Sequence, residues 1–134
     1  MNADAALRYV ETNHRAVLVT HRRDGGLQTS PIAVLPGPDG TFIISTRSVT
    51  AKARNLARDP RATLCVFPDS FSGSWVHVDG EVTVLRQPEA LPALADFYHR
   101  RNGEDTTLPA FRQRMEQEGR VLLSMRPTHI VGPA

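Results

Sequence analysis

Residues 41–67, TFIISTRSVTAKARNLARDPRATLCVF, decide how the rest of the chain can be arranged. Two apolar runs, 41–46 and 62–67, have the length and the β-branched content of strands. Between them a short helix is predicted at about 51–58, and Pro60 ends it because proline restricts the residue that precedes it. The stretch therefore predicts two strands joined by one short helix.

The predicted helix has a small apolar face and a strongly basic remainder. Its core face is expected to be Ala53, Leu56 and Ala57, which leaves the cations pointing outward. Five cations stand in the stretch against a single acid, although the whole protein carries a net charge of only +2. An anionic partner is therefore expected. The cations are Arg47, Lys52, Arg54, Arg58 and Arg61, and the acid is Asp59.

The start of this helix is a candidate phosphate site. Ser48 or Thr50 is expected to cap it, and Lys52 lies in its first turn. Backbone N–H groups, the helix dipole and an ammonium group then meet at one point. The alternative is an ordinary solvated helix face, which is what charged runs usually form. The one-sided sign of the charge favours the anion site.

The length and composition of the chain favour one domain, residues 1–134. A chain of 134 residues can build a single core but not a nucleotide domain plus a separate catalytic domain.

No apolar run approaches the length of a membrane span and the first residues lack the order of a signal peptide, so we expect a cytoplasmic protein without a membrane partner. The single cysteine, Cys65, lies in an apolar run and is expected to be buried.

The remaining segments predict a mainly β protein of the α+β class. A hairpin turn is expected at 24–26, and a bend is expected at Asp79 and Gly80. Short turns join the strands and no dinucleotide or P-loop motif is present, so a small antiparallel barrel with peripheral helices is favoured over a doubly wound sheet. The expected strands are 16–21, 27–35, 41–46, 62–67, 75–85 and 121–131, and the expected helices are 3–13, 51–58, 89–101 and 108–118.

The strand that contains Pro31 is a candidate ligand surface. Proline cannot donate to a ladder, so this point is expected at an edge or a bulge. Main-chain groups left free beside Ser30 and Pro31 can hydrogen-bond the polar edge of a flat heterocycle, and an ordinary edge strand is the alternative. Trp75, the only tryptophan, follows a polar loop and is expected either to stack on a ligand or to pack in the core.

Catalysis by side chains alone has little support in the sequence. The five histidines show no metal-ligand spacing, and neither a Ser-His-Asp order nor an HExxH motif is present. A phosphate-like site together with an aromatic residue and a proline-interrupted strand is typical of a protein that positions a redox cofactor. We therefore expect a bound cofactor to supply the chemistry.

Four segments, taken in order, resemble the pyridoxamine 5'-phosphate oxidase-like split β-barrel proteins. They are QTSPIAVL, FIISTRSVTAKARNLARDPRATLCV, WVHVDGEVTVL and RVLLSMRPTHIVG, and they span nearly the whole chain. Within that family, the run K-x-R-N-L-x-x-D-P-R is most similar to the short actinobacterial branch that binds the deazaflavin coenzyme F420. The resemblance implies a six-stranded antiparallel split β-barrel of the FMN-binding type. It also implies a homodimer with two cofactor sites across the subunit interface.

The resemblance further implies which residues hold the cofactor. The family's phosphate-binding lysine maps to Lys52, and Trp75 would approach the site, from the other subunit. Relatives often carry another basic residue where this chain has Thr50, so the phosphate would be held with one charge fewer. The chain also lacks the final Arg- and Trp-bearing segment of the true vitamin B6 enzymes. The implied contacts are Thr29, Ser30, Pro31, Ile32, Ser45, Thr46, Arg47, Thr50, Ala51, Lys52, Arg54, Asn55 and Trp75.

Three functional hypotheses follow from these residues. The first is an oxidoreductase in which reduced F420 passes a hydride to an electron-poor organic substrate, with Arg54, Arg58 or Arg61 serving the anionic tail of the cofactor. The second uses FMN on the same barrel. The third is a carrier or stress-related protein that binds a flavin or deazaflavin without turnover. Nucleic acid is a poorer partner, because aromatic residues make up only 6% of the chain.

Overall fold

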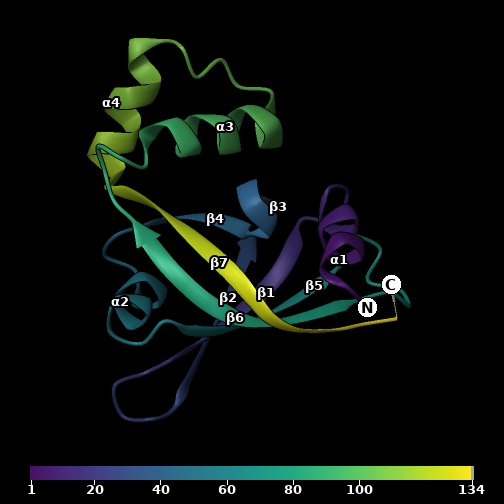
Figure 1. Ribbon diagram of the computed structural model, residues 1–134. Coiled ribbons are helices and arrows are strands. Elements are labelled where there is room, and N and C mark those ends of the chain that lie inside the picture. The colour runs from purple at the N-terminus through teal and green to yellow at the C-terminus, as the bar shows by residue number, and fades with distance from the viewer. Residues whose placement is uncertain (134) are drawn as a thin grey trace.

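The computed structural model describes residues 1–133, in which a single antiparallel sheet is curled into a half-barrel and accompanied by four α-helices (Figure 1). A short 3-10 turn, Pro38–Gly40, joins two of the strands. The elements in chain order are α1 (Ala3–Val10), β1 (Arg15–His21), β2 (Leu27–Ala33), β3 (Leu35–Pro36), β4 (Phe42–Arg47), α2 (Ala51–Arg58), β5 (Arg61–Phe67), β6 (Val76–Leu85), α3 (Leu91–Asn102), α4 (Pro109–Glu118) and β7 (Arg120–Val131).

The strands follow the order β2-β1-β5-β6-β7-β4-β3, and all neighbours are antiparallel. The predicted split barrel is confirmed, but the described chain has seven strands where six were predicted. The segment 27–35, predicted as one strand, divides after Ala33, and Leu35 and Pro36 then pair with β4 instead of β1. The barrel is split between β2 and β4, which the strand order does not pair.

Side chains that alternate along the strands fill the inside of the half-barrel. On β1, Ala16, Leu18 and Thr20 are buried while their neighbours are partly exposed, as expected for a strand with one face in the core. Helices α1 and α2 close this interior, with Val10 and Leu56 in the same apolar cluster as the strand residues. Apolar burial stabilises by about 25 cal/mol per Å², so this cluster is a major source of stability.

Polar caps set the starts of the two helices that close the interior. The side chain of Asn2 accepts a hydrogen bond from the N–H of Ala5 at 2.8 Å, and that of Thr50 accepts one from Ala53 at 3.3 Å. The cap by Thr50 was one of the two predicted alternatives. The bounds of α2 agree with the predicted 51–58, whereas α1 ends at Val10, three residues before the predicted end.

Helices α3 and α4 form a second layer, which Figure 1 shows together above the sheet. Ile43 of β4 and Leu122 of β7 point away from the barrel interior, because successive strand residues face opposite sides. They pack with Leu94 of α3 and with Phe111 and Met115 of α4 in an apolar cluster separate from the interior. The first half of β4, Phe42 to Ile44, is therefore buried on both faces between the two layers.

The outer face of β1, β5 and β6 has a different character. Val17, Cys65 and His77 are register partners on this face, and all three are partly or fully exposed. The prediction that Cys65 is buried was wrong. Leu64 and Val66 occupy the interior, so the residue between them faces outward, although the whole run is apolar.

The bend predicted at Asp79 and Gly80 is confirmed as a register shift between β6 and β7. A Cβ atom on Gly80 would collide with the carbonyl oxygen of Arg126, so only glycine allows the two backbones to approach this closely. The paired arms of β6 and β7 curve across the front of the molecule in Figure 1. This curvature brings the start of β7 close to the end of β4 and to α2.

Candidate functional site

A cavity of about 350 Å³, here called the barrel cavity, opens at the split between β2 and β4. The edge strand β2 forms one wall, and the end of β4 with the first turn of α2 forms another. Helix α3 and the start of β7 complete it. The lining residues are Pro31, Ile32, Ala33, Ser45, Thr46, Arg47, Thr50, Lys52, Phe97, Tyr98, Arg101 and Arg120.

The charge of the barrel cavity is one-sided. In the described chain it is lined by four cations and by no acidic side chain. One of them, Arg120, is compensated from outside, because its Nε lies 2.7 Å from Oε1 of Glu118. Arg47, Lys52 and Arg101 have no acidic partner within 4.0 Å among residues 1–133. Three positive charges without a salt-bridge partner therefore line one small space, which favours an anion there.

The start of α2 is held in place by threonine hydroxyl groups. Besides capping the helix, the hydroxyl of Thr50 donates to the carbonyl of Arg47 at 2.9 Å and lies 3.1 Å from Oγ1 of the buried Thr46. The first N–H groups of a helix have no partner within it, and here they open beside Lys52. The end of β4 and the start of α2 thus form one rigid corner with free donors.

Lys52 is the only lysine in the chain, and it is partly buried in this corner. Burial lowers the pKa of its ammonium group, and the nearby guanidinium of Arg120 lowers the pKa further. A bound anion acts in the opposite direction, because it stabilises the charged form of the amine. Lys52 is thus a cation whose charge gains a partner only when an anion enters the cavity.

The open edge of β2 supplies free main-chain groups. At one end of the β1–β2 ladder the N–H of Val34 donates to the carbonyl of His14 at 2.9 Å. Hydrogen-bonded pairs alternate along an antiparallel ladder, so the main-chain groups of Thr29, Pro31 and Ala33 point to the open edge. The edge position predicted for Pro31 is confirmed. Its missing N–H costs the ladder nothing and blocks the addition of a further strand at this point.

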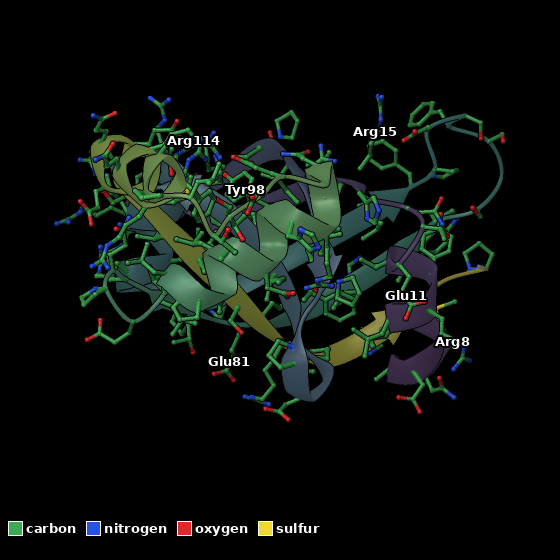
Figure 2. The ribbon with its side chains drawn as sticks, turned by 90° about the horizontal axis from the view of Figure 1, so that it is seen from above. Arg8, Glu11, Arg15, Glu81, Tyr98 and Arg114 are labelled. Carbon is green, nitrogen blue, oxygen red and sulfur yellow. The ribbon has the colours of Figure 1, made fainter. Side chains whose placement is uncertain are left out.

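Tyr98 of α3 lines the barrel cavity and was missed by the sequence analysis. Its hydroxyl lies 2.9 Å from Oγ of Ser45, and the guanidinium of Arg114 lies 5.5 Å from the centre of its ring. Figure 2 shows Tyr98 and Arg114 close to each other in the helical layer. Arg101, one turn along α3 from Tyr98, also lines the cavity and was also not predicted. Only the packing of α3 on β4 brings these two side chains to the split.

The other flank of α2 faces a second cavity, of about 500 Å³, here called the arginine cavity. The predicted core face of α2 is corrected at this point, since Ala57 is exposed and Asn55 is 8% exposed. Asn55 turns inward because its amide donates to Oγ1 of Thr20 at 3.1 Å inside the barrel. The lining residues are Arg23, Ala51, Arg54, Asn55, Ala57 and Arg58.

The implied cofactor contacts are therefore divided in space. Three of them line neither cavity, namely Thr29, Ser30 and Trp75. Trp75 is 40% exposed and precedes β6, whose far end reaches the start of β7. Within one chain, Trp75 thus lines neither cavity. The barrel cavity takes Pro31, Ile32, Ser45, Thr46, Arg47, Thr50 and Lys52, and the arginine cavity takes Ala51, Arg54 and Asn55.

Comparison with known proteins identifies the family. The model of the family described as pyridoxamine 5'-phosphate oxidase matches residues 3–132. The chain belongs to the pyridoxamine 5'-phosphate oxidase family. The match covers the barrel, both cavities and the helical layer, and it confirms the family resemblance seen in the sequence.

Solved structures share the fold at low sequence identity. A conserved hypothetical protein from Mycobacterium tuberculosis is 20% identical with a TM-score of 0.78, over 98% of this chain and 84% of that one. An F420 reductase is 22% identical with a TM-score of 0.70, over 91% of this chain and 92% of that one. A putative pyridoxamine 5'-phosphate oxidase from Listeria innocua is 15% identical with a TM-score of 0.71, over 98% and 97%. These likenesses show the fold.

None of the helices in residues 1–133 is long and apolar enough to cross a membrane. In the same residues, no three His, Cys, Asp or Glu side chains are grouped so that they could hold a metal ion.

Proposed function

We propose that this protein is a cytoplasmic oxidoreductase that binds coenzyme F420 in the barrel cavity and reduces an electron-poor organic substrate. One observation carries the proposal. The barrel cavity combines three cations that form no salt bridge in the described chain, the start of a helix and the open edge of β2 in a single space. The F420 reductase among the similar folds supports the choice of a deazaflavin over other cofactors.

The residues of the cavity fit the phosphate-bearing arm and the ring of such a cofactor. Lys52 and the first N–H groups of α2 would hold the phosphate, with Arg47 and Arg101 beside it. The free main-chain groups of β2 around Pro31 would meet the polar edge of the ring. When bound, reduced F420 supplies a hydride, and the protein's task is to hold donor and acceptor in contact.

Tyr98 is the proposed proton donor. Hydride addition to an electron-poor double bond leaves a negative charge on the substrate, which must be neutralised by a proton. Tyr98 lines the cavity, and its hydroxyl lies 2.9 Å from Oγ of Ser45, which orients it. Lys52 and Arg101 line the same cavity and would offset the charge left on the phenol oxygen. Water then returns the proton to the tyrosine.

The proposal includes a homodimer joined through the outer face of β1, β5 and β6. Trp75 and Val131 are 40% and 42% exposed, and Val131 is the register partner of His77 on this face. Exposed apolar groups of this kind are typical of an interface. A second copy would bring its own Trp75 toward the barrel cavity, which the indole of the same chain does not line. Light scattering after size-exclusion chromatography is expected to give twice the mass of one chain.

Two alternatives use the same cavity. FMN carries a comparable phosphate arm, and the cations of the barrel cavity do not by themselves distinguish the ring of FMN from that of F420. A carrier would hold either cofactor without turnover. A preparation that is yellow after expression in a host without F420 would favour FMN, and tight binding without reduction of any acceptor would favour the carrier.

The deciding experiment is a fluorescence titration of the purified protein with F420 and with FMN. The wild type is compared with Lys52→Ala and with Arg112→Ala, a control that removes an exposed cation on α4 that pairs with Glu116. We expect F420 to bind more tightly than FMN, and only Lys52→Ala to weaken binding. Reduced F420 is then mixed with a panel of electron-poor acceptors and its oxidation is followed. Preference for FMN, or binding of neither cofactor, would overturn the proposal.

A further inference from the structure

A pocket of about 460 Å³, here called the proline pocket, lies between α3 and the turn that contains Pro36 and Pro38. Figure 1 shows β3, where this turn begins, below α3. Ala93, Asp96 and Arg100 line the pocket from α3 and have the spacing of one helix face. Among residues 1–133, the proline pocket shares no lining residue with the barrel cavity or the arginine cavity. It is therefore a separate space.

The floor of the proline pocket is apolar. Leu85 of β6 and Ala93 of α3 are partly exposed there, and the buried Ile43 and Leu122 complete the floor. Pockets that bind small organic molecules have this size and a mostly apolar lining with a few polar groups. Contact with Leu85 and Ala93 would remove apolar surface from water, which favours the binding of an apolar group.

The turn that forms the outer wall of the pocket is held in a fixed position. The N–H of Gly37 donates to the carbonyl of Thr41 at 2.8 Å, and the hydroxyl of Thr41 donates to the carbonyl of Pro38 at 2.6 Å. A Cβ atom on Gly37 would collide with Ile43, so only glycine allows the turn to approach the sheet this closely. The wall is therefore formed before a ligand arrives, which lowers the entropic cost of binding.

An ion pair forms the polar rim of the proline pocket. Nε of Arg100 donates to Oδ2 of Asp96 at 3.0 Å, and Nη1 donates to the carbonyl of Pro36 at 2.8 Å, which ties α3 to β3. In the described chain, no other charged residue lines the pocket, so the charge of its lining is balanced.

The rim keeps free hydrogen-bonding groups of both kinds. Among residues 1–133, Oδ1 of Asp96 accepts no hydrogen bond, because Arg100 uses only Oδ2. The guanidinium of Arg100 has more N–H groups than these contacts engage. An acceptor and a donor thus remain available on neighbouring side chains beside an apolar floor.

We propose that the proline pocket binds an apolar ring compound that carries a hydroxyl group. A rigid ring loses little conformational freedom in a pre-formed pocket, and the apolar floor suits it. The hydroxyl group can donate to the free oxygen of Asp96 and accept from Arg100, whereas a charged group would be repelled by one member of the ion pair. The inference goes beyond the proposed function and does not depend on it, since the proline pocket and the barrel cavity have different linings.

The pocket is tested by fluorescence titration of the full chain with 2-naphthol and with 2-methoxynaphthalene. The two probes share a ring system, but the methoxy group cannot donate a hydrogen bond. We expect 2-naphthol to bind at least about fivefold more tightly, because its hydroxyl group donates to a carboxylate. Equal affinity for the two probes, or no saturable binding of 2-naphthol, would overturn the proposal.

The position of the bound probe is tested by filling the pocket. Ala93→Leu adds volume inside it, and Ala110→Leu adds the same volume at an exposed position of α4 that lines neither the pocket nor either cavity. We expect 2-naphthol binding to weaken at least about tenfold in Ala93→Leu and less than about twofold in Ala110→Leu. Equal weakening would contradict the proposed position. Thermal unfolding by circular dichroism confirms that the variants are folded.

The role of the rim is tested with two matched ion pairs. Asp96→Ala removes the proposed acceptor, and Glu116→Ala breaks a pair of the same i,i+4 spacing with Arg112 on α4. The preference for 2-naphthol is expected to fall below about twofold in Asp96→Ala and to be kept in Glu116→Ala. A preference kept in both variants would contradict recognition of the hydroxyl group. Because Asp96 is exposed, this test stays decisive if Ala93→Leu does not fold.

Two further results would overturn the proposal by assigning a different place or occupant. Loss of 2-naphthol binding in Lys52→Ala, with none in Ala93→Leu, would place the ring in the barrel cavity. A dimer whose mass falls to that of one chain in Ala93→Leu would show that a second copy fills the pocket. F420 affinity is expected to be unchanged in Ala93→Leu, so the failure of either proposal leaves the other standing.

Discussion

The two flanks of α2 carry charge of the same sign in different surroundings. Lys52 is partly buried between the edge of β2 and α3, whereas Arg54 and Arg58 are exposed. A charge in a partly buried place interacts more strongly with a ligand, because less water screens it. A count of the cations in a stretch of sequence therefore does not show which of them interacts most strongly with a ligand. The burial of each side chain does.

The largest expected effect is on cofactor binding. Replacing Lys52 with Ala removes the partly buried cation from the proposed phosphate site, which is expected to weaken F420 binding roughly 30- to 100-fold, or about 2 to 3 kcal/mol. The corresponding Arg54→Ala change on the exposed flank is expected to weaken it by less than about threefold at 0.15 M salt. Fluorescence titration measures both. Equal losses in the two variants would show that the flanks do not differ.

The next effect is on the stability of the helix that separates the flanks. Asn55→Ala leaves the hydroxyl of Thr20, which is 0% exposed, without its donor and frees Arg58 from one hydrogen bond. A lost buried hydrogen bond of this kind is expected to lower the free energy of unfolding by about 1 to 3 kcal/mol. Urea denaturation measures the loss. Asn102→Ala, at the exposed end of α3, is the control and should change stability by less than about 0.5 kcal/mol.

The third effect is on turnover within the barrel cavity. Tyr98→Phe keeps the ring but removes the proposed proton donor, so the reduction rate of an acceptor is expected to fall about tenfold while the Kd for F420 changes less than about twofold. Tyr9→Phe is a matched control, because Tyr9 makes the same kind of contact, 2.9 Å to Oγ of Ser74, outside both cavities. A rate that is unchanged in Tyr98→Phe would remove the residue from the mechanism.

The smallest effect is a shift in the titration of Lys52. After reductive methylation with ¹³C-formaldehyde, the only lysine gives one side-chain signal whose pH dependence reports its pKa. We expect that pKa to lie below the pKa of the same methylated lysine in the urea-unfolded protein because of burial, and to rise when pyrophosphate is added. A pKa at or above the unfolded value without ligand would contradict the partly buried position.

The sign of this shift also predicts a change in stability. Because the pKa of Lys52 is lower in the folded protein, its protonated form disfavours folding below that pKa, and the loss is relieved as the pH rises toward 10.5. Lys52→Met should therefore raise the free energy of unfolding at pH 7, but only slightly, because the side chain is only partly buried and the water around it screens most of the unfavourable charge. Arg58→Met on the exposed flank should give no such gain. Urea denaturation at pH 7 compares the two variants.

Features that depend on neighbours in the sequence were predictable. The bounds of α2, the cap by Thr50, the edge position of Pro31 and the bend at Gly80 all follow from local backbone chemistry. A hydroxyl at the residue before the helix is enough to cap it. Proline fits wherever the strand requires no backbone N–H donor. The errors concerned apolar residues whose side chains could face either the barrel interior or the solvent, namely Cys65 and Ala57. Both are apolar, and both are exposed because a neighbouring residue occupies the interior.

The sequence by itself determined a mainly β barrel and a basic helix start at Lys52, because strand periodicity, capping and charge are local properties. The family was indicated by the resemblance of four sequence segments, not by these local properties. Only the tertiary structure decided which cations share a space. It brought Tyr98 and Arg101 of α3 to the barrel cavity and separated Arg54 from Lys52 by the width of one helix. The physical reason is that curvature of the sheet and packing of the helical layer join residues far apart in the chain, and no local pattern encodes which of them meet.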